Sequence, residues 1–177
     1  MRKVYFSVLA ILMLVACSES ERATEQQAAG NQTPTTHTAV DTAKARQDLN
    51  ALADEIHNLF KKKDIAFVDK HMAKDGIYLG TDPNEILNFN DFRAYQEQML
   101  GDTAVRIPDY KIERREIVIN GASAVIIDQY FFPDLSEKMM IRNISHARHE
   151  DGRWMVDMFS WNFIPRNEDV EKINKAL

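Results

Sequence analysis

One aspartate interrupts an apolar strand face, and it is the residue best placed in this sequence for proton chemistry. Residues 122–132 have the pattern of a strand, in which alternate side chains share a face. Asp128 interrupts the face whose other members are Ala122, Ala124, Ile126 and Tyr130. A buried carboxylate without a partner has a raised pKa, which suits a general acid or base. A cross-strand pair with Arg142 would instead keep Asp128 ionised, and the sequence leaves both alternatives open.

His146 is the second candidate for acid–base work, because it lies in the middle of a predicted strand among apolar neighbours. An imidazole that titrates near neutral pH can act as a general base or as a proton-dependent ligand contact. It can equally be a hydrogen-bonded histidine in a core or an interface. We expect Tyr78 and Tyr130 to offer hydroxyls to a bound ligand, although tyrosines on strands also serve packing.

The other histidines are scattered, so the sequence predicts no metal site. His57 lies off the apolar stripe of its helix, His149 lies at a hairpin end, and His37 lies in a polar segment. The chain has six glycines and no phosphate-binding glycine loop, so no cofactor is expected. A Ser-His-Asp set cannot be argued from separated residues without geometry.

Cys17, the only cysteine, follows a short apolar run at the N-terminus. Arg2 and Lys3 precede this run, which is too short to span a bilayer and has the pattern of an export signal. The sequence Leu-Val-Ala-Cys at 14–17 resembles the lipobox of bacterial lipoproteins. That resemblance implies a signal peptide over 1–16, cleavage before Cys17, and acylation of this cysteine as a membrane anchor. An ordinary secretory signal with an incidental cysteine is the alternative.

The charge composition of the chain argues against two classes of binding partner. The 22 basic residues become 20 once Arg2 and Lys3 are removed, against 27 acidic residues, which gives a formal charge of −7. This acidic balance argues against nucleic acid as a partner and against electrostatic binding to anionic lipid. Residues 17–40 contain no large apolar residue before Val40, so we expect a flexible tether there. The folded domain is then expected over 41–177.

The first half of this domain is predicted to be helical. Apolar residues at helical spacing predict a first helix, capped by Asp41 or Thr42, with Leu49, Leu52 and Ala53 on its buried face. A second helix is expected from about residue 64 to a stop near Gly76, followed by a brief strand over 77–79. A third helix is expected between Asn90 and Gly101.

The second half has the pattern of a four-strand antiparallel meander. Segments 110–119 and 122–132 flank Asn120-Gly121, and segments 139–149 and 153–163 flank Asp151-Gly152. These dipeptides are strong hairpin signals. A short helix is expected after Asn167. The sequence therefore predicts an α+β domain in which helices pack on one face of a curved sheet.

This order of elements resembles the SnoaL-like branch of the nuclear transport factor 2-like (NTF2-like, cystatin-like) superfamily. The resemblance covers about residues 45–165. The stretches that carry it are Leu-Gly-Thr-Asp-Pro-Asn-Glu at 79–85 and Glu-Asp-Gly-Arg-Trp at 150–154, while Asp-Phe-Arg-Ala-Tyr at 91–95 also resembles the association domain of calcium/calmodulin-dependent kinase II. It implies a cone-shaped barrel, with three N-terminal helices on a curved antiparallel sheet. Enzymes of the superfamily use an Asp or His inside the cone, but many members bind or assemble without catalysis.

The resemblance also implies which strand faces line the cone. It places Trp154, Val156 and Met158 inward on the last strand, and Arg142 and His146 on the same face of the preceding strand. Related domains often carry histidines on the last strand, where this chain has Met158 and Ser160. Both faces of the last strand are largely apolar, so we expect the outer face to meet a second subunit in a homodimer; light scattering would test this.

We therefore expect a membrane-anchored, extracytoplasmic domain that binds a small apolar or amphipathic molecule, or a protein partner, without catalysis. In a cell with two membranes, Ser18 after the cysteine favours the outer membrane, facing the periplasm. The alternative is a cofactor-independent cyclase, isomerase or dehydratase that uses Asp128 or His146 as acid or base. That alternative requires Asp128 to be unpaired, with a raised pKa, inside a closed cavity. A pure assembly module, with a filled cone, is the third possibility.

Overall fold

The structure, a computed structural model, describes residues 41–133 and 140–177. The predicted signal peptide and tether, with Cys17, lie outside the described residues. In the described part, the helices are α1 (Thr42–Lys61), α2 (Ala66–His71), α3 (Phe89–Gly101) and α4 (Val170–Ala176), the last preceded by a 3-10 turn (Asn167–Asp169). None of the helices in these two ranges has the length and hydrophobicity needed to cross a bilayer.

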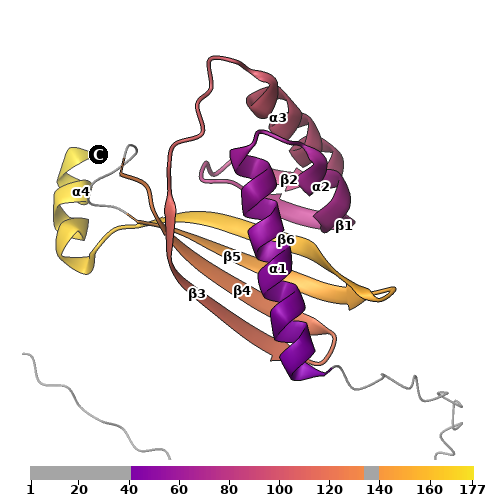
Figure 1. The fold of residues 1–177 in the computed structure, drawn as a ribbon. Coiled ribbons are helices and arrows are strands. Elements are labelled where there is room, and N and C mark those ends of the chain that lie inside the picture. Colours follow the sequence, from indigo (N-terminus) through magenta and orange to yellow (C-terminus); the bar gives the residue numbers. More distant parts are fainter. Residues whose placement is uncertain (1–40, 134–139) are drawn as a thin grey trace, which may run out of the picture. The chain divides into compact units, whose positions relative to one another are not determined.

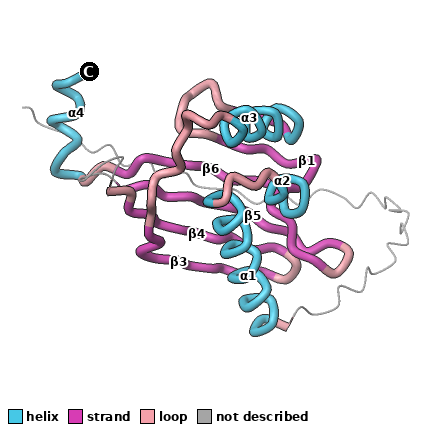
Figure 2. The backbone as a smooth tube through the Cα atoms, turned by 45° about the horizontal axis from the view of Figure 1, so that its top comes forward, coloured by secondary structure: helices cyan, strands magenta, loops and turns pink. Residues whose placement is uncertain are grey.

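The strands form one six-stranded sheet. They are β1 (Met72–Leu79), β2 (Ile86–Asn88), β3 (Lys111–Asn120), β4 (Ser123–Phe131), β5 (Met140–Glu150) and β6 (Arg153–Ile164), in the spatial order β2-β1-β6-β5-β4-β3. Strands β3 to β6 form the predicted antiparallel meander, whereas β1 runs parallel to β6. Figures 1 and 2 show α1 crossing one face of the curved sheet, with α2 and α3 beside it.

The α+β fold class is confirmed, with two differences in detail. The sheet is open, because β2 and β3 form its two edges, and it is mixed rather than purely antiparallel. The parallel pairing involves β1, which follows α2 and pairs with β6, the last strand of the meander, rather than with β3, its first strand.

The predicted second helix is too long. It ends at His71, and Met72 already has extended backbone angles and pairs with Val156 of β6. The prediction was wrong because apolar residues at positions 65, 68 and 72 suit a helix, but they suit equally a short helix that leads into a strand. The short strand β2 was not predicted; it pairs with β1 over Ile86–Asn88.

Local capping signals fix the start of two helices. The Asp41 carboxylate accepts hydrogen bonds from the backbone N–H of Ala43 and Lys44 at the start of α1. The Asn88 side chain caps α3 in the same way, two residues before the predicted position. Leu49, Leu52 and Ala53 are buried on α1, as its apolar stripe predicts.

The dipeptide signal locates the loop correctly in the second hairpin and is one residue too early in the first. Asp151 and Gly152 both have positive φ angles and form the two-residue loop between Glu150 and Arg153, as predicted. In the first hairpin the loop is formed by residues 121 and 122, because Asn120 pairs with Ser123. Gly121 takes the positive φ there.

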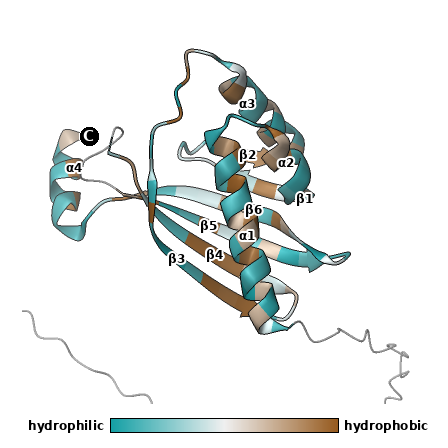
Figure 3. Ribbon diagram, in the orientation of Figure 1, coloured by the Kyte–Doolittle hydropathy of each residue, from teal (hydrophilic) through white to brown (hydrophobic). Residues whose placement is uncertain are grey.

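The hydrophobic core lies between α1, α2, α3 and the sheet face that they cover. Its main cluster includes Leu49, Val68, Tyr78, Phe92, Ile126 and Val156. Figure 3 shows long hydrophobic stretches on β3 and β4 beneath α1. Any cavity within this core is therefore lined by side chains from these helices and from the covered face of the sheet.

Candidate functional site

A cavity of about 220 Å³ lies within this core layer, between α1, α3 and the sheet. Eight of the residues that line it are Phe, Tyr or Trp. Tyr78 stacks on Phe92 with ring centroids 4.6 Å apart, and Tyr130 stacks on Trp161 at 5.5 Å. Phe159 meets Phe92 edge-on at 5.1 Å. Such rings provide a large apolar surface with few rotatable bonds, which suits a flat, mostly apolar molecule.

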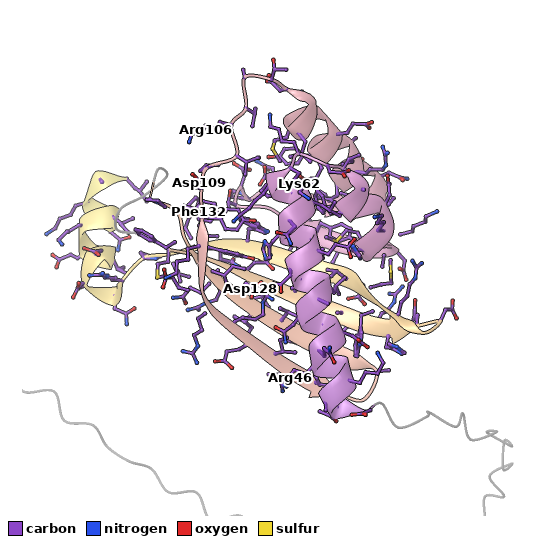
Figure 4. The ribbon with its side chains drawn as sticks, viewed as in Figure 1. Arg46, Lys62, Arg106, Asp109, Asp128 and Phe132 are labelled. Carbon is purple, nitrogen blue, oxygen red and sulfur yellow. The ribbon has the colours of Figure 1, made fainter. Side chains whose placement is uncertain are left out.

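Asp128 lies on the cavity wall and is paired with an arginine that the sequence analysis did not identify. Arg115 of β3 donates from Nε to Asp128 Oδ1 at 2.6 Å and from a terminal nitrogen to Oδ2 at 3.0 Å. The same guanidinium contacts Asp54 of α1 at 2.7 Å. Figure 4 shows Asp128 beneath the middle of α1. The side chain of Asp128 is only 3% exposed, so this two-point contact is shielded from water.

The expected pair between Asp128 and Arg142 is wrong. Arg142 stands opposite Gln129 in the ladder and donates to its side-chain oxygen at 3.0 Å. Asp128 stands opposite Arg115 on one side and Asn143 on the other. Neighbouring positions on a strand point to opposite faces, so Arg142 is on the far side of the sheet from Asp128.

His57 completes the polar cluster around Asp128. Its Nε2 lies 3.1 Å from Asp128 Oδ2 and 3.0 Å from the Tyr130 hydroxyl, while its Nδ1 lies 3.0 Å from the Tyr110 hydroxyl. Both ring nitrogens are therefore engaged within the protein. The cluster joins α1 to β3 and β4, and three of its members, His57, Asp128 and Tyr130, line the cavity.

The charge state of Asp128 follows from these contacts. Burial would raise the pKa of this carboxyl, but hydrogen bonds from His57 and Arg115, with the charge of Arg115, outweigh burial and hold the pKa below its ordinary value. Burial raises the pKa of Tyr130 and Tyr110, and the charge of Asp128 raises both further. The cluster thus consists of an ionised, fully bonded carboxylate and neutral phenols, which makes it a poor proton acceptor for a molecule in the cavity.

Tyr78 lines the cavity with its ring rather than with its hydroxyl. The hydroxyl donates to the backbone oxygen of Ala73 at 2.6 Å and lies 3.2 Å from that of Val156. Burial raises the pKa of Tyr78, which keeps the phenol protonated. Its polar atom is therefore committed to holding β1 against β6.

A β-bulge in β6 changes which residues of this strand point toward the core. Ala147 pairs with Val156, but His146 pairs with Met158, so Asp157 is an inserted residue. One inserted residue reverses the alternation of side chains. Trp154 and Val156 point into the core as expected, with Trp154 in the main core cluster. The inward prediction fails for Met158, and Phe159 and Trp161 line the cavity instead.

Arg142 and His146 also lie on the outer face, contrary to the expectation. The inward residues of β5 are Asn143 and Ser145, which line the cavity. On the outer face, His146 contacts the Ser123 hydroxyl at 2.7 Å through Nε2 and Asp157 through Nδ1. These three residues form a bonded Ser-His-Asp set, but it lies across the sheet from the cavity. His146 therefore cannot act on a molecule bound there.

Sequence reasoning missed several polar residues of this region. Among them are His57, Arg115, Gln96, Asn143 and Ser145. The Asn120-Gly121 signal could not identify Arg115, because the observed loop lies one residue later and only that register places Arg115 opposite Asp128. Among the described residues, no group of three or more His, Cys, Asp or Glu side chains could hold a metal ion.

Comparison with known proteins gives one family and a common fold. The family model of the SnoaL-like domain matches residues 49–157. An NTF2-like protein of unknown function from Pseudomonas putida is 15% identical, with a TM-score of 0.59 over 68% of this chain and 87% of that chain. A cystatin-like fold protein from Burkholderia xenovorans is 13% identical, with a TM-score of 0.59 over 71% of this chain and 95% of that chain. No curated protein matches. At these identities the solved structures establish the fold alone.

Proposed function

The chain belongs to the SnoaL-like domain family, and we propose that its cavity binds a small, mostly apolar molecule without transforming it. The observation that carries this proposal is the aromatic-walled cavity of about 220 Å³. A dry cavity of about 150 Å³ holds benzene. This cavity therefore has room for a flat molecule of about two fused rings.

The alternative of an acid–base enzyme has less support. It requires an unpaired Asp128 with a raised pKa, whereas both carboxylate oxygens accept hydrogen bonds from Arg115. Its other candidate base, His146, lies on the opposite face of the sheet. His57 is near the cavity, but both of its nitrogens are engaged by Asp128 and the two tyrosines. These contacts favour binding over proton transfer.

Filling the cavity should weaken ligand binding. Ala53 lies on α1, lines the cavity and is buried. In Ala53→Leu the added carbons occupy the space a ligand would use, so we expect calorimetry to show at least a tenfold loss of affinity for indene, a flat bicyclic hydrocarbon. Ala51→Leu is the matched control, because Ala51 is exposed on the same helix. Equal affinity of both variants for indene would place its binding outside this cavity.

We further propose that the mature protein is anchored by lipid on Cys17 and is extracytoplasmic, at the outer membrane if its source has two membranes. The support is the sequence pattern at 1–17 alone. Several acyl chains hold a protein durably at a membrane, whereas the acidic chain has no electrostatic attraction to anionic lipid. The homodimer through the outer sheet face also stays a prediction.

The anchor has a direct test in the host cell. Cys17→Ala removes the acylated thiol, so the protein should move from the membrane fraction to the soluble fraction. Ser18→Ala, which leaves the cysteine in place, should remain in the membrane fraction. Membrane retention of the Cys17→Ala protein after cell fractionation would contradict lipid anchoring.

A further inference from the structure

Gln96 on α3 is a buried amide with unused hydrogen-bonding capacity inside the cavity. The residue is 8% exposed and belongs to the cavity lining. Among residues 41–133 and 140–177, none provides a donor to its side-chain oxygen Oε1. A buried acceptor that has lost its hydrogen bonds to water and gained no partner lowers the stability of the folded protein. Such groups are rare in native proteins, and where one occurs it calls for an explanation such as a functional role.

The polar groups that α1, β4 and β5 contribute to the cavity are already paired. Asp128 accepts from Arg115, and His57 is engaged at both nitrogens. On the β5 wall, the Ser145 hydroxyl donates to Asn143 Oδ1 at 2.6 Å. Gln96 therefore differs from its neighbours, because a bound molecule can satisfy it without breaking an existing hydrogen bond.

We infer that Gln96 is the recognition residue of the cavity and that it accepts a hydrogen bond from an N–H or O–H group of a neutral, flat and otherwise apolar ligand. This inference rests on the proposed function and deepens it. It places the polar contact on α3 rather than on the Asp128 cluster. The Asp128 cluster then joins α1 to the sheet and is not the ligand contact.

The surroundings of Gln96 indicate the rest of the ligand. Phe92 and Met99, one turn before and after it on α3, line the cavity, as does Phe159 across from them. The acidic side chains in the lining are Glu85 and Asp128, and Arg115 is committed to two carboxylates. An anion would thus meet negative charge without a free cation, which disfavours an acidic ligand. A charged amine would lose its hydration in an apolar space.

Two probes of the same shape test this inference. Indole and indene are both flat bicyclic molecules, but only indole carries an N–H donor. We compare their dissociation constants by calorimetry in the wild-type chain, in Gln96→Leu and in Gln98→Leu. Gln98 is exposed on the same helix and serves as the matched control. The difference in hydration between the probes is the same for every protein, so it cancels when the ratio of the two constants in a variant is compared with that in the wild-type chain.

In Gln96→Leu the preference for indole over indene should fall about tenfold relative to wild type, which is the effect of one buried hydrogen bond. The preference should be unchanged in Gln98→Leu. Binding of indene to Gln96→Leu shows that the variant is folded and that its cavity is intact. An unchanged preference in Gln96→Leu would overturn the role of Gln96 and leave the proposed function standing. Failure of both probes to bind the wild-type chain would overturn the proposed function and this inference together.

Discussion

Arg115→Met should destabilise the domain by about 3–5 kcal/mol, because it leaves the Asp128 carboxylate buried without its charged partner. Arg115 is 13% exposed and makes two hydrogen bonds to Asp128. Methionine retains most of the volume of the arginine side chain, so the loss of stability is caused by the missing charge rather than by poorer packing. Urea unfolding followed by circular dichroism measures the free energy of unfolding.

Two further variants sharpen this prediction. Arg114→Met removes an exposed arginine of the same strand, whose ion pair with Glu116 is solvated, and should cost less than about 1 kcal/mol. The double variant Arg115→Met with Asp128→Leu removes both charges and should recover much of the lost stability. A loss below about 1 kcal/mol for Arg115→Met alone would show that Asp128 is not a buried, paired carboxylate.

The same ion pair makes stability depend on pH. Asp128 has a pKa below its ordinary value in the folded state, so the folded state binds its proton less readily than the unfolded state does. Its stabilising contribution is therefore fully present above the unfolded pKa of about 3.9 and is lost as pH falls through the lower folded pKa. Acid titration of the unfolding free energy should show a shallower decline below about pH 4 in the double variant than in wild type.

Trp154→Ala should cost about 3–5 kcal/mol, because the indole side chain lies in the main core cluster before the bulge of β6. A loss of this size approaches the whole stability of a domain, so unfolding of the variant is measured in the presence of a stabilising osmolyte. Phe163→Ala is the control on the same strand. Phe163 is 42% exposed, so its loss should cost less than about 1 kcal/mol. Near-wild-type unfolding of Trp154→Ala would contradict its inward orientation.

Much of the fold followed from local signals in the sequence. The cap at Asp41, the apolar stripe of α1 and the Asp151-Gly152 turn each depend on neighbouring residues, and each is confirmed. The parallel pairing of β1 with β6 joins segments about 80 residues apart. No periodicity within either segment specifies such a pairing, so it was not predicted.

The site was harder to predict because a shift of one residue reverses a strand face. In the first hairpin, the loop lies one residue later than the Asn-Gly signal suggests, and that register brings Arg115 opposite Asp128. In the second hairpin, the inserted Asp157 turns Met158 outward and Trp161 inward. The sequence does not indicate His57 as a site residue, because it lies off the apolar stripe of its helix. That position nevertheless brings its ring within hydrogen-bonding distance of Asp128.

The most direct test of a ligand-binding cavity is a nuclear magnetic resonance titration of indene into the wild-type domain, followed through methionine methyl groups. Met72 and Met99 line the cavity, whereas Met158 lies outside it on β6. Our account predicts saturable shifts of the Met72 and Met99 methyl signals, with the Met158 signal unmoved. Unchanged signals from Met72 and Met99 at saturating indene would contradict it.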